Sequence, residues 1–464
     1  MSQAALARSG RVKNRVSIGM LSLGCPKTLV DSELILGVLD PHRYRVARQI
    51  GDCDVALLNT CAFIEEAKQE SIDYILKLAE LKKEGRIKAI IVLGCLVQRY
   101  HKELEHALSE VDAFVGTGEY NALNGVLDQV VQKRRISQVG PSPGFLYTAD
   151  MSRVPLTPLH TRYIKISEGC DHVCTFCTIP TFRGRHRSRE IEDVVKEATQ
   201  LVRDGARELV LTGQDTTYFG RDTRGAFLLP ELLRELDRIS GLVWIRILYA
   251  YPSCVNEDLI ETIARQPKVC HYLDMPLQHI SDRILRSMKR GMNQQSTRTL
   301  IRKLRDRIPD LAIRTTFIVG FPGETEDDFK ELLDFMEEAR FERLGLFMYS
   351  AEEHSGSAGY DGQVATAVKR KRFDEGMQLQ QKISVGNNKR LIGSKLSILI
   401  EGKDGKHPHR YVGRSYQDAP EVDGSVYVDT PQDVRLSPGQ FVSAVVEAAH
   451  EYDLSARWVQ KESA

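Results

Sequence analysis

The first hundred residues repeat one pattern three times: an apolar strand-like run, a small or polar step, and then a cysteine. The runs cover residues 17–24, 55–60 and 89–94, and they lead into Cys25, Cys61 and Cys95. The cysteines are 36 and 34 residues apart, close to one strand-helix-strand unit each, and residues 65–83 between two of them have helical spacing. The pattern predicts a doubly wound parallel sheet.

These three cysteines should therefore lie close together. Ligands of doubly wound sheets bind outside the carboxyl ends of the strands, where all three cysteines fall. One buried thiol is often only a small hydrophobic side chain, but three at equivalent positions indicate a shared ligand. We predict that they hold an iron-sulfur cluster, with zinc as the alternative. Cys53, Cys254 and Cys270 lack this register and are predicted to be ordinary packing or loop thiols.

A second set of cysteines, Cys170, Cys174 and Cys177, has the spacing CxxxCxxC and follows a short apolar run. A four-iron cluster usually takes four cysteines, so a set of three leaves one iron able to hold a small ligand such as S-adenosylmethionine. Zinc prefers four ligands and could recruit His172 or His186, which keeps a zinc site open. The odd number of cysteines, nine, and the lack of a secretory signal argue against disulfides.

Six strand-like runs, each followed by a helical pattern or a loop, occupy the middle of the chain. They cover residues 163–167, 208–212, 244–250, 272–275, 312–319 and 343–349. This alternation is typical of a parallel, barrel-like sheet. We predict a partial (β/α)6 barrel that is open on one side.

The ligand site of such a barrel should lie at the carboxyl ends of its strands. Besides the CxxxCxxC set, the sequence places Gly213, Gln214 and Asp215 after the second run and Gly320 and Gly323 after the fifth. Glycine lets the backbone approach a ligand closely, and Gln214 or Asp215 could contact the amino group or ribose of a nucleoside ligand. We predict that these residues bind S-adenosylmethionine, although a GxxG sequence is as often a tight turn.

The C-terminal part has short apolar runs, at 396–400, 426–428 and 441–446, separated by glycine, proline and aspartate turns. These runs predict a small antiparallel β barrel, which makes the chain an α/β protein of three domains. The domains are predicted at 14–131, 156–386 and 388–458. Two charged segments stay ambiguous: the acidic segment 418–423 is either a surface for a basic protein partner or a solvated loop. The basic segment 181–189 is either a solvated face or an anion or substrate contact.

The overall charge excludes a general attraction to nucleic acid or membrane, because 64 basic residues face 63 acidic ones. The longest apolar runs, such as 89–97, are far too short to span a bilayer. We expect a cytoplasmic protein that does not bind a membrane. Residues 1–15 are predicted to form a disordered basic tail, with a transit peptide as the alternative.

Over nearly its full length the chain resembles the radical S-adenosylmethionine methylthiotransferases, and most closely the branch that modifies a ribosomal protein. The matching segments are 23–33, 59–67, 94–95, the CxxxCxxC set with 178–180, 272–279, and the terminal barrel, which is similar to a TRAM domain. One departure is Thr28, where the family usually has asparagine after Cys-Pro-Lys. It leaves the three cysteines intact and puts only a local contact in doubt.

The resemblance implies two 4Fe-4S clusters and S-adenosylmethionine as cofactors, with Phe176 among the residues that bind the latter. The cluster on Cys170, Cys174 and Cys177 would release a 5′-deoxyadenosyl radical, and the other would carry the sulfur to be inserted. A second S-adenosylmethionine would supply the methyl group. The acceptor would be the β carbon of an aspartate in protein twelve of the small ribosomal subunit, giving 3-methylthioaspartate. An electron donor such as flavodoxin or ferredoxin and a sulfur donor would be further partners.

Two other functions stay open at this point. A tRNA adenosine methylthiotransferase would use the same chemistry, although the Cys-Pro-Lys and Cys-Ala-Phe-Ile contexts and the slightly acidic terminal barrel argue against it. A zinc-bearing ribosome- or RNA-binding module without catalysis is the more distant alternative. Iron content and colour after anaerobic purification would separate this module from both enzymes, since a zinc protein is colourless.

Overall fold

The computed structural model describes residues 15–141 and 143–460. It divides into two compact units: the first contains residues 1–156 and 181–184, and the second contains residues 157–180 and 185–464. Residue 14, where the first domain is predicted to start, and nearly all of the predicted basic tail lie outside the described residues.

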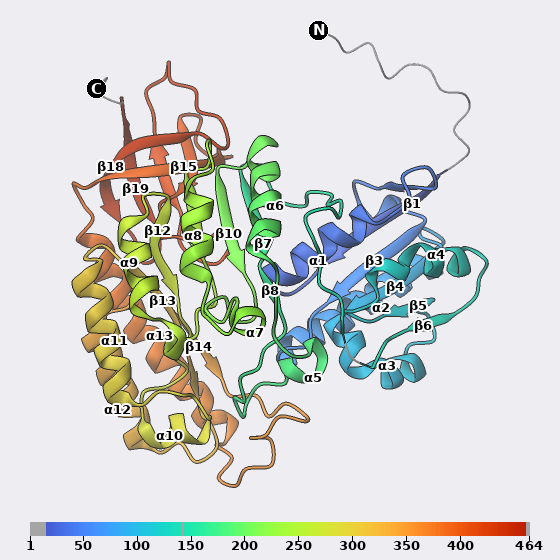
Figure 1. The fold of residues 1–464 in the computed structure, drawn as a ribbon, viewed down its shortest axis with the longest axis horizontal. Helices are drawn as coiled ribbons and strands as arrows, with labels where there is room; N and C mark the ends of the chain where they lie inside the picture. The colour runs from blue at the N-terminus through green and yellow to red at the C-terminus, as the bar shows by residue number, and fades with distance from the viewer. Residues whose placement is uncertain (1–14, 142, 461–464) are drawn as a thin grey trace. The chain divides into compact units, whose positions relative to one another are not determined.

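The first unit is built on a six-stranded parallel sheet with the strand order β2-β1-β3-β4-β5-β6, and the predicted doubly wound sheet is confirmed (Figure 1). Its central strands are buried on both faces, which explains their uninterrupted apolar runs. The strands are β1 (Val16–Ser22), β2 (Tyr44–Val46), β3 (Val55–Thr60), β4 (Ala89–Gly94), β5 (Ala113–Val115) and β6 (Ile136–Gln138). The helices are α1 (Pro26–Gly37), α2 (Glu65–Lys83), α3 (Cys95–Ala107) and α4 (Leu123–Val131), with short 3-10 turns at Ile50–Asp52 and Tyr120–Ala122.

The second unit contains six parallel strands in the order β14-β13-β12-β11-β10-β7, an open sheet that confirms the partial barrel. These strands are β7 (Thr161–Lys165), β10 (Glu208–Thr212), β11 (Trp244–Ile247), β12 (Val269–Asp274), β13 (Ala312–Val319) and β14 (Arg343–Met348). Figure 1 shows the major helices along the outer face: α6 (Ile191–Arg203), α8 (Leu229–Asp237), α9 (Glu257–Arg265), α11 (Gln294–Arg307) and α12 (Glu326–Ala339). The smaller elements are β8 (Ser167–Glu168), β9 (Arg187–Ser188), α7 (Arg221–Arg224), a 3-10 turn (Pro252–Cys254) and α10 (Asp282–Ser287). Helix α5 (Ile179–Arg183) begins in the second unit, and its last three residues belong to the first.

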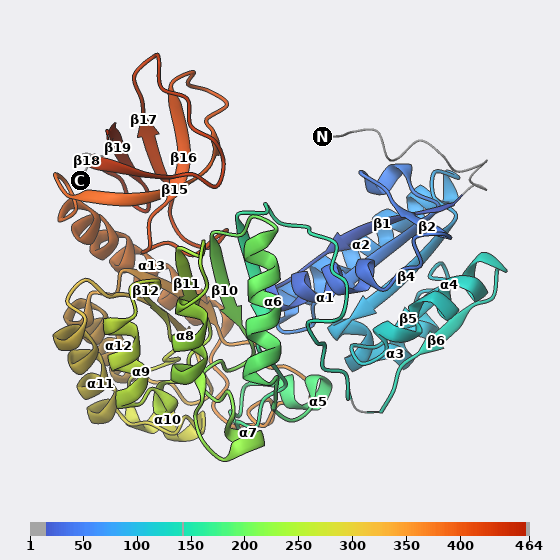
Figure 2. The same ribbon diagram turned by 45° about the horizontal axis from the view of Figure 1, so that its top comes forward.

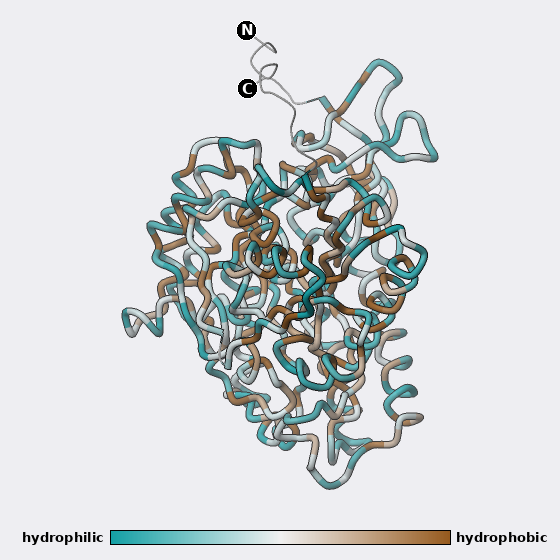
Figure 3. Tube along the Cα trace, turned by 90° about the vertical axis from the view of Figure 1, so that its right-hand side faces the viewer, coloured by the Kyte–Doolittle hydropathy of each residue, from teal (hydrophilic) through white to brown (hydrophobic). Residues whose placement is uncertain are grey.

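The helices of the partial barrel begin where the sequence supplies capping side chains. Asn256 accepts a hydrogen bond from the backbone of Leu259 at the start of α9, and Asn293 and Thr325 form capping boxes on α11 and α12. The inner faces of these helices pack with the strands into one large apolar core. Accordingly, the hydrophobic stretches run through the interior while the outer turns are largely hydrophilic (Figure 3). Among the described residues, no helix is both long and apolar enough to cross a bilayer.

Helix α13 (Thr366–Lys389) leads from the partial barrel to a closed five-stranded barrel with the order β15-β16-β17-β19-β18 (Figure 2). The predicted terminal barrel is thus confirmed, although β17 and β19 pair in parallel while the other pairs are antiparallel. Its strands are β15 (Lys395–Lys403), β16 (Arg410–Arg414), β17 (Val426–Asp429), β18 (Phe441–Ala449) and β19 (Leu454–Val459).

The acidic segment 418–423 does not form an acidic docking surface, because the side chains of its two aspartates are buried against the partial barrel and only Glu421 of its three acidic residues is exposed. Arg343 donates to Asp418 at 2.5 Å, and the Tyr272 hydroxyl donates to Asp423 at 2.7 Å. The interpretation of this segment as a surface for a basic partner is therefore wrong. The two aspartates pair with arginine and tyrosine side chains of the same chain, which the spacing of the sequence does not reveal.

Candidate functional site

The first three cysteines lie at the carboxyl ends of three adjacent parallel strands. Cys25 precedes the first residue of α1 shortly after β1, Cys61 directly follows β3, and Cys95 is the first residue of α3 after β4. Burial, together with the neighbouring Cys25 and Cys95 thiols, raises the pKa of Cys61 to about 12. The structure thus brings the three predicted residues together.

Two glycines make this convergence possible. Gly24 and Gly94 directly precede Cys25 and Cys95, and their φ angles of +92° and +98° belong to the left-handed region. A Cβ on Gly24 would lie 2.7 Å from the Cβ of Cys61, and one on Gly94 would lie 2.3 Å from the Asn59 side-chain oxygen. A glycine directly before each of these two cysteines is therefore a steric requirement of the site.

Thr28, which stands where the family usually has asparagine, contacts the first cysteine. The Thr28 hydroxyl lies 3.4 Å from the Cys25 Sγ atom, and the Thr28 carbonyl accepts from the Asn59 side chain at 3.1 Å. Burial by itself raises the pKa of Cys25, but Lys27 and the hydrogen bonds from Thr28 outweigh it, and the net pKa is lowered. Threonine at this position therefore still favours the thiolate, which is the form that binds metals.

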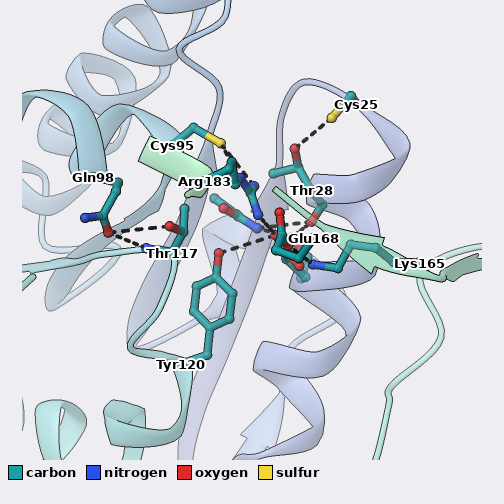
Figure 4. A network of polar contacts seen from close by, with 12 residues as sticks. Cys25, Thr28, Cys95, Gln98, Thr117, Tyr120, Lys165, Glu168 and Arg183 are labelled. Atoms are coloured by element: carbon teal, nitrogen blue, oxygen red, sulfur yellow. Dashed lines mark hydrogen bonds and ion pairs between the residues drawn. The ribbon is translucent and has the colours of Figure 1, made fainter. Parts of the chain in front are cut away.

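The basic segment 181–189 is not a uniformly solvated face. Arg183 and Arg189 are both buried, whereas the side chain of Arg185 is 89% exposed and pairs with Asp171 at 3.2 Å. Arg183 donates from Nη2 and Nε to the Cys95 Sγ atom at 3.0 and 3.2 Å (Figure 4). Sequence reasoning noticed the alternating charges, but it did not identify this contact with a cysteine.

The second set of cysteines lies in a loop that follows β8, at the carboxyl end of the first barrel strand. The loop folds back on itself, because the backbone N–H of Cys177 donates to the carbonyl of Cys174 at 3.1 Å. All three thiols are partly exposed. Burial, together with the charges of Cys177 and Cys174, raises the pKa of Cys170 to about 12, so these thiols are also neighbours.

A histidine inside this loop is held by the second barrel strand. His172 Nε2 lies 2.6 Å from Asp215 Oδ2, and its ring stacks on Tyr251 with centroids 3.6 Å apart. The other Asp215 oxygen accepts from the backbone of Thr217 at 2.9 Å. Asp215 is buried, and in this structure it orients the cysteine loop; its predicted contact with a nucleoside ligand stays a prediction.

Gln214 and Gly213 lie beside a buried carboxylate that sequence reasoning did not select. Glu168 accepts from Gln214 Nε2 at 2.7 Å and from Lys165 Nζ at 2.5 Å, and Figure 4 shows the Lys165 contact. A Cβ on Gly213 would lie 2.6 Å from the Ser167 hydroxyl oxygen, so only glycine leaves room here. Its position could have identified Glu168 as a site residue from the sequence, because it lies two residues before Cys170 at the end of a strand.

Phe176 and the GxxG turn are parts of one small apolar cluster. Phe176 packs against a group formed by Ile284, Met288, Phe321 and Tyr349. Gly320 and Gly323, on either side of Phe321, have positive φ angles of +74° and +78°. Their backbone N–H groups donate to Glu324 Oε2 and to the carbonyl of Gly362, each at 2.8 Å. The GxxG sequence is therefore a tight turn, and its predicted ligand contact stays a prediction.

The spacing of the thiols fits iron-sulfur clusters better than zinc. Among the described residues, the only three potential ligand atoms that all lie within 4.8 Å of one another belong to His172, Asp215 and Cys254. Tetrahedral zinc, with Zn–S bonds of about 2.3 Å, would hold its sulfurs only about 3.8 Å apart. Neither set of three cysteines is so compact, whereas thiolates on different irons of a four-iron cluster are spread more widely. The donor chemistry of both sets thus suits such a cluster.

Three families match successive parts of the chain. A family described as uncharacterized, UPF0004, matches residues 17–116, the radical SAM superfamily matches residues 164–336, and the TRAM domain matches residues 392–459. The first set of cysteines, Cys25, Cys61 and Cys95, lies within the UPF0004 match. The CxxxCxxC set lies within the radical SAM match.

Curated relatives match almost the whole chain. The chain is 46% identical to the ribosomal protein uS12 methylthiotransferase RimO of Geobacter sulfurreducens, over 94% of this chain and 97% of the relative. It is 48% identical to the protein of the same name from Anaeromyxobacter, over 95% of this chain and 93% of the relative. The RimO of Desulforamulus reducens is 44% identical over 96% of this chain and 100% of its own length.

Solved structures show the same fold at much lower identity. The radical S-adenosylmethionine methyltransferase TsrM of Kitasatospora setae, solved with cobalamin and a [4Fe-4S] cluster bound, has a TM-score of 0.53 at 15% identity, covering 72% of this chain and 75% of its own. A second TsrM structure, with tryptophan and an analogue of S-adenosylmethionine bound, also has a TM-score of 0.53, at 13% identity, and covers 84% of this chain and 79% of its own.

Proposed function

Because the chain belongs to the family of ribosomal protein uS12 methylthiotransferases, we propose that it inserts a methylthio group at the β carbon of an aspartate in protein twelve of the small ribosomal subunit. The product would be 3-methylthioaspartate. The observation that carries the proposal is the presence of two sets of three cysteines, each at the carboxyl ends of strands in its own parallel sheet. Two such sets suit a reaction that needs both a radical and a source of sulfur.

Cys170, Cys174 and Cys177 would hold the 4Fe-4S cluster that binds S-adenosylmethionine, and Cys25, Cys61 and Cys95 would hold the second one. When bound, these groups supply a 5′-deoxyadenosyl radical and the sulfur for insertion. The chain's own residues position this chemistry: Asp215 and Tyr251 hold His172 in the cysteine loop, and Phe176 of the same loop packs against the apolar cluster around Phe321. Phe176, Gly213, Gln214, Asp215, Gly320 and Gly323 are proposed to surround the S-adenosylmethionine.

The remaining parts of the proposal concern domains, location and partners. The domain bounds 14–131, 156–386 and 388–458 are supported by the family matches over 17–116, 164–336 and 392–459. An electron donor such as flavodoxin or ferredoxin and a separate sulfur donor would serve the enzyme. Because its substrate is a ribosomal protein, we place the enzyme in the cytoplasm.

Mass spectrometry of reaction products tests this function. The cluster-loaded protein is incubated anaerobically with S-adenosylmethionine, a reductant and sulfide, and ribosomal protein uS12 and tRNA are offered in parallel reactions. We expect a methylthio mass gain on one aspartate of the ribosomal protein. A gain on tRNA alone would move the chain to the adenosine-modifying branch. No gain, together with zinc in place of iron, would leave a binding module without catalysis.

The glycine steps before the cysteines provide a structural test. Gly24→Ala should remove the first cluster and keep the second, because a Cβ at this positive φ would collide with the Cβ of Cys61. Iron content after anaerobic reconstitution should fall from about eight to about four atoms per chain.

Gly85→Ala is the matched control, since Gly85 has a similar positive φ of +73° but no atom within 4 Å of an added Cβ. It should keep the full iron content, because it introduces the backbone strain without the collision. A Gly24→Ala protein that also keeps all its iron would show that the close packing of Gly24 on Cys61 is not needed for the cluster.

A further inference from the structure

The guanidinium of Arg183 donates two hydrogen bonds to one of the six predicted ligand sulfurs. Both bonds go to Cys95 Sγ, at 3.0 and 3.2 Å (Figure 4). The third nitrogen, Nη1, donates to Asp31 Oδ2 at 2.8 Å. The side chains of Arg183 and Asp31 are 4% and 0% exposed, so these bonds form away from water.

The arginine is held in this position by contacts on both sides. The Thr117 hydroxyl donates to the carbonyl of Phe182, the residue before Arg183, at 3.2 Å. Asp31, which lies on α1, also accepts from the Tyr120 hydroxyl at 3.4 Å. Asp31 therefore orients the guanidinium and offsets part of its charge, while two N–H groups remain directed at the sulfur.

Hydrogen bonds to the sulfurs that ligate an iron-sulfur cluster tune its reduction potential. Reduction adds negative charge to the cluster, and two donors from a buried cation stabilise that charge more than the charge of the oxidised form. We propose that Arg183 is a positioning residue that raises the reduction potential of the cluster on Cys25, Cys61 and Cys95. This inference rests on the proposed function, since it requires a cluster at these cysteines.

The second cysteine set has a weaker counterpart of this contact. Arg290 donates once to Cys174 Sγ, at 3.4 Å, and its guanidinium lies over the Tyr251 ring at 4.1 Å from the centroid. It also donates to the carbonyl of Pro276 at 2.6 Å, so its N–H groups are shared among several acceptors. Arg290 would therefore stabilise the reduced form of its cluster less than Arg183 would stabilise the reduced form of the other cluster.

A redox titration monitored by electron paramagnetic resonance tests the proposal. The parent is the full chain with Cys170, Cys174 and Cys177 replaced by alanine, so that only the first cluster contributes to the signal. Arg183→Met should disfavour reduction of that cluster at least tenfold, a negative shift of about 59 mV for a one-electron couple. Arg183→Lys, which keeps the charge but only a single point of donation, should shift the potential less in the same direction.

Arg153→Met is the matched control. Arg153 is also buried and also pairs with a carboxylate of α1, because its Nε donates to Glu33 at 3.1 Å, and this partner is a carboxylate in place of a ligand sulfur. We expect this variant to keep the parent's potential.

Three results would separate the possible failures. A parent that binds no iron would refute the cluster assignment itself, and with it the proposed function, rather than the role of Arg183. An Arg183→Met protein with full iron content and an unchanged potential would refute the role of Arg183. If Arg183→Met does not bind iron, the Arg183→Lys variant tests the role of Arg183 in its place. The proposal would be overturned if Arg183→Lys had the same reduction potential as the parent, or if it too failed to bind iron.

Discussion

Replacing Cys170 with alanine is expected to lower the cleavage of S-adenosylmethionine more than about 100-fold, because loss of a ligand should exceed the 10–100-fold effects of outer-shell partners. Replacing Cys61 with alanine should leave cleavage intact and block sulfur transfer. The physical reason is that the two residues belong to sets built on different sheets, Cys61 after β3 and Cys170 after β8. Quantification of 5′-deoxyadenosine and of the methylthio product in the same reaction measures both steps.

Cys53→Ala is the control for the loss of a buried thiol. Cys53 lies in the first unit, where its Sγ atom is 2.9 Å from the carbonyl of Ile50, and it has no place in the register of the other three cysteines. Both cleavage and sulfur transfer should survive this change. An equal loss of cleavage in the Cys170 and Cys61 variants would show that the two sets do not divide the reaction between them.

The second large effect is on stability and concerns Glu208. Its oxygens accept from Arg246 at 2.8 Å and from Arg414 at 2.6 Å, and the side chains of all three are almost fully buried. Glu208→Ala would leave the buried Arg246 without this carboxylate and Arg414 with Glu401, which is partly exposed. Such a loss of a buried partner costs about 3–5 kcal/mol in the free energy of unfolding. Chemical denaturation followed by circular dichroism measures this loss.

Glu447→Ala provides the comparison for an exposed ion pair, which lies in the terminal barrel. Glu447 pairs with Arg457 at 2.6 Å, but about half of each side chain is exposed. Its removal should cost less than about 1 kcal/mol. Equal effects of the two substitutions would contradict the argument that burial makes Glu208 important.

The same carboxylate predicts how stability responds to acid. Burial by itself would raise the pKa of Glu208, but Arg414 and Arg246 outweigh it and lower the pKa from 4.5 to about 2. Its contribution is therefore fully present above about pH 4.5 and is lost as the pH falls toward 2. The stability difference between the wild-type protein and Glu208→Gln should shrink across this window, whereas a constant difference would contradict the assigned ionisation.

The sequence predicted the strands and the cysteine positions because both depend on local patterns. The runs 55–60 and 312–319 coincide with β3 and β13, and the helical stretch 65–83 coincides with α2. Burial of parallel strands on both faces produces apolar runs that can be recognised in a single sequence. The ends of these strands then placed both sets of cysteines without any knowledge of long-range contacts.

The contacts that could not be predicted join residues far apart in the chain. Arg183 and Asp31 are 152 residues apart, and Arg414 and Glu208 are 206 residues apart. Nothing in the local pattern shows that an arginine in a charged run is buried or that an acidic loop faces an arginine. Such pairings depend on the tertiary fold, which is why the acidic segment 418–423 was misinterpreted.

The buried charges between the partial barrel and the terminal barrel limit how this enzyme can be rearranged. Removing the terminal barrel would take away Arg414 and Asp418, which would leave Arg343 without this carboxylate and Glu208 with one of its two arginine partners, Arg246. A chimera that carries a terminal barrel from another protein would meet the same mismatch unless both sides of the junction were exchanged together. The terminal barrel is therefore not an independent module. A protein in which this barrel alone was exchanged, in order to change the substrate, should have a lower free energy of unfolding.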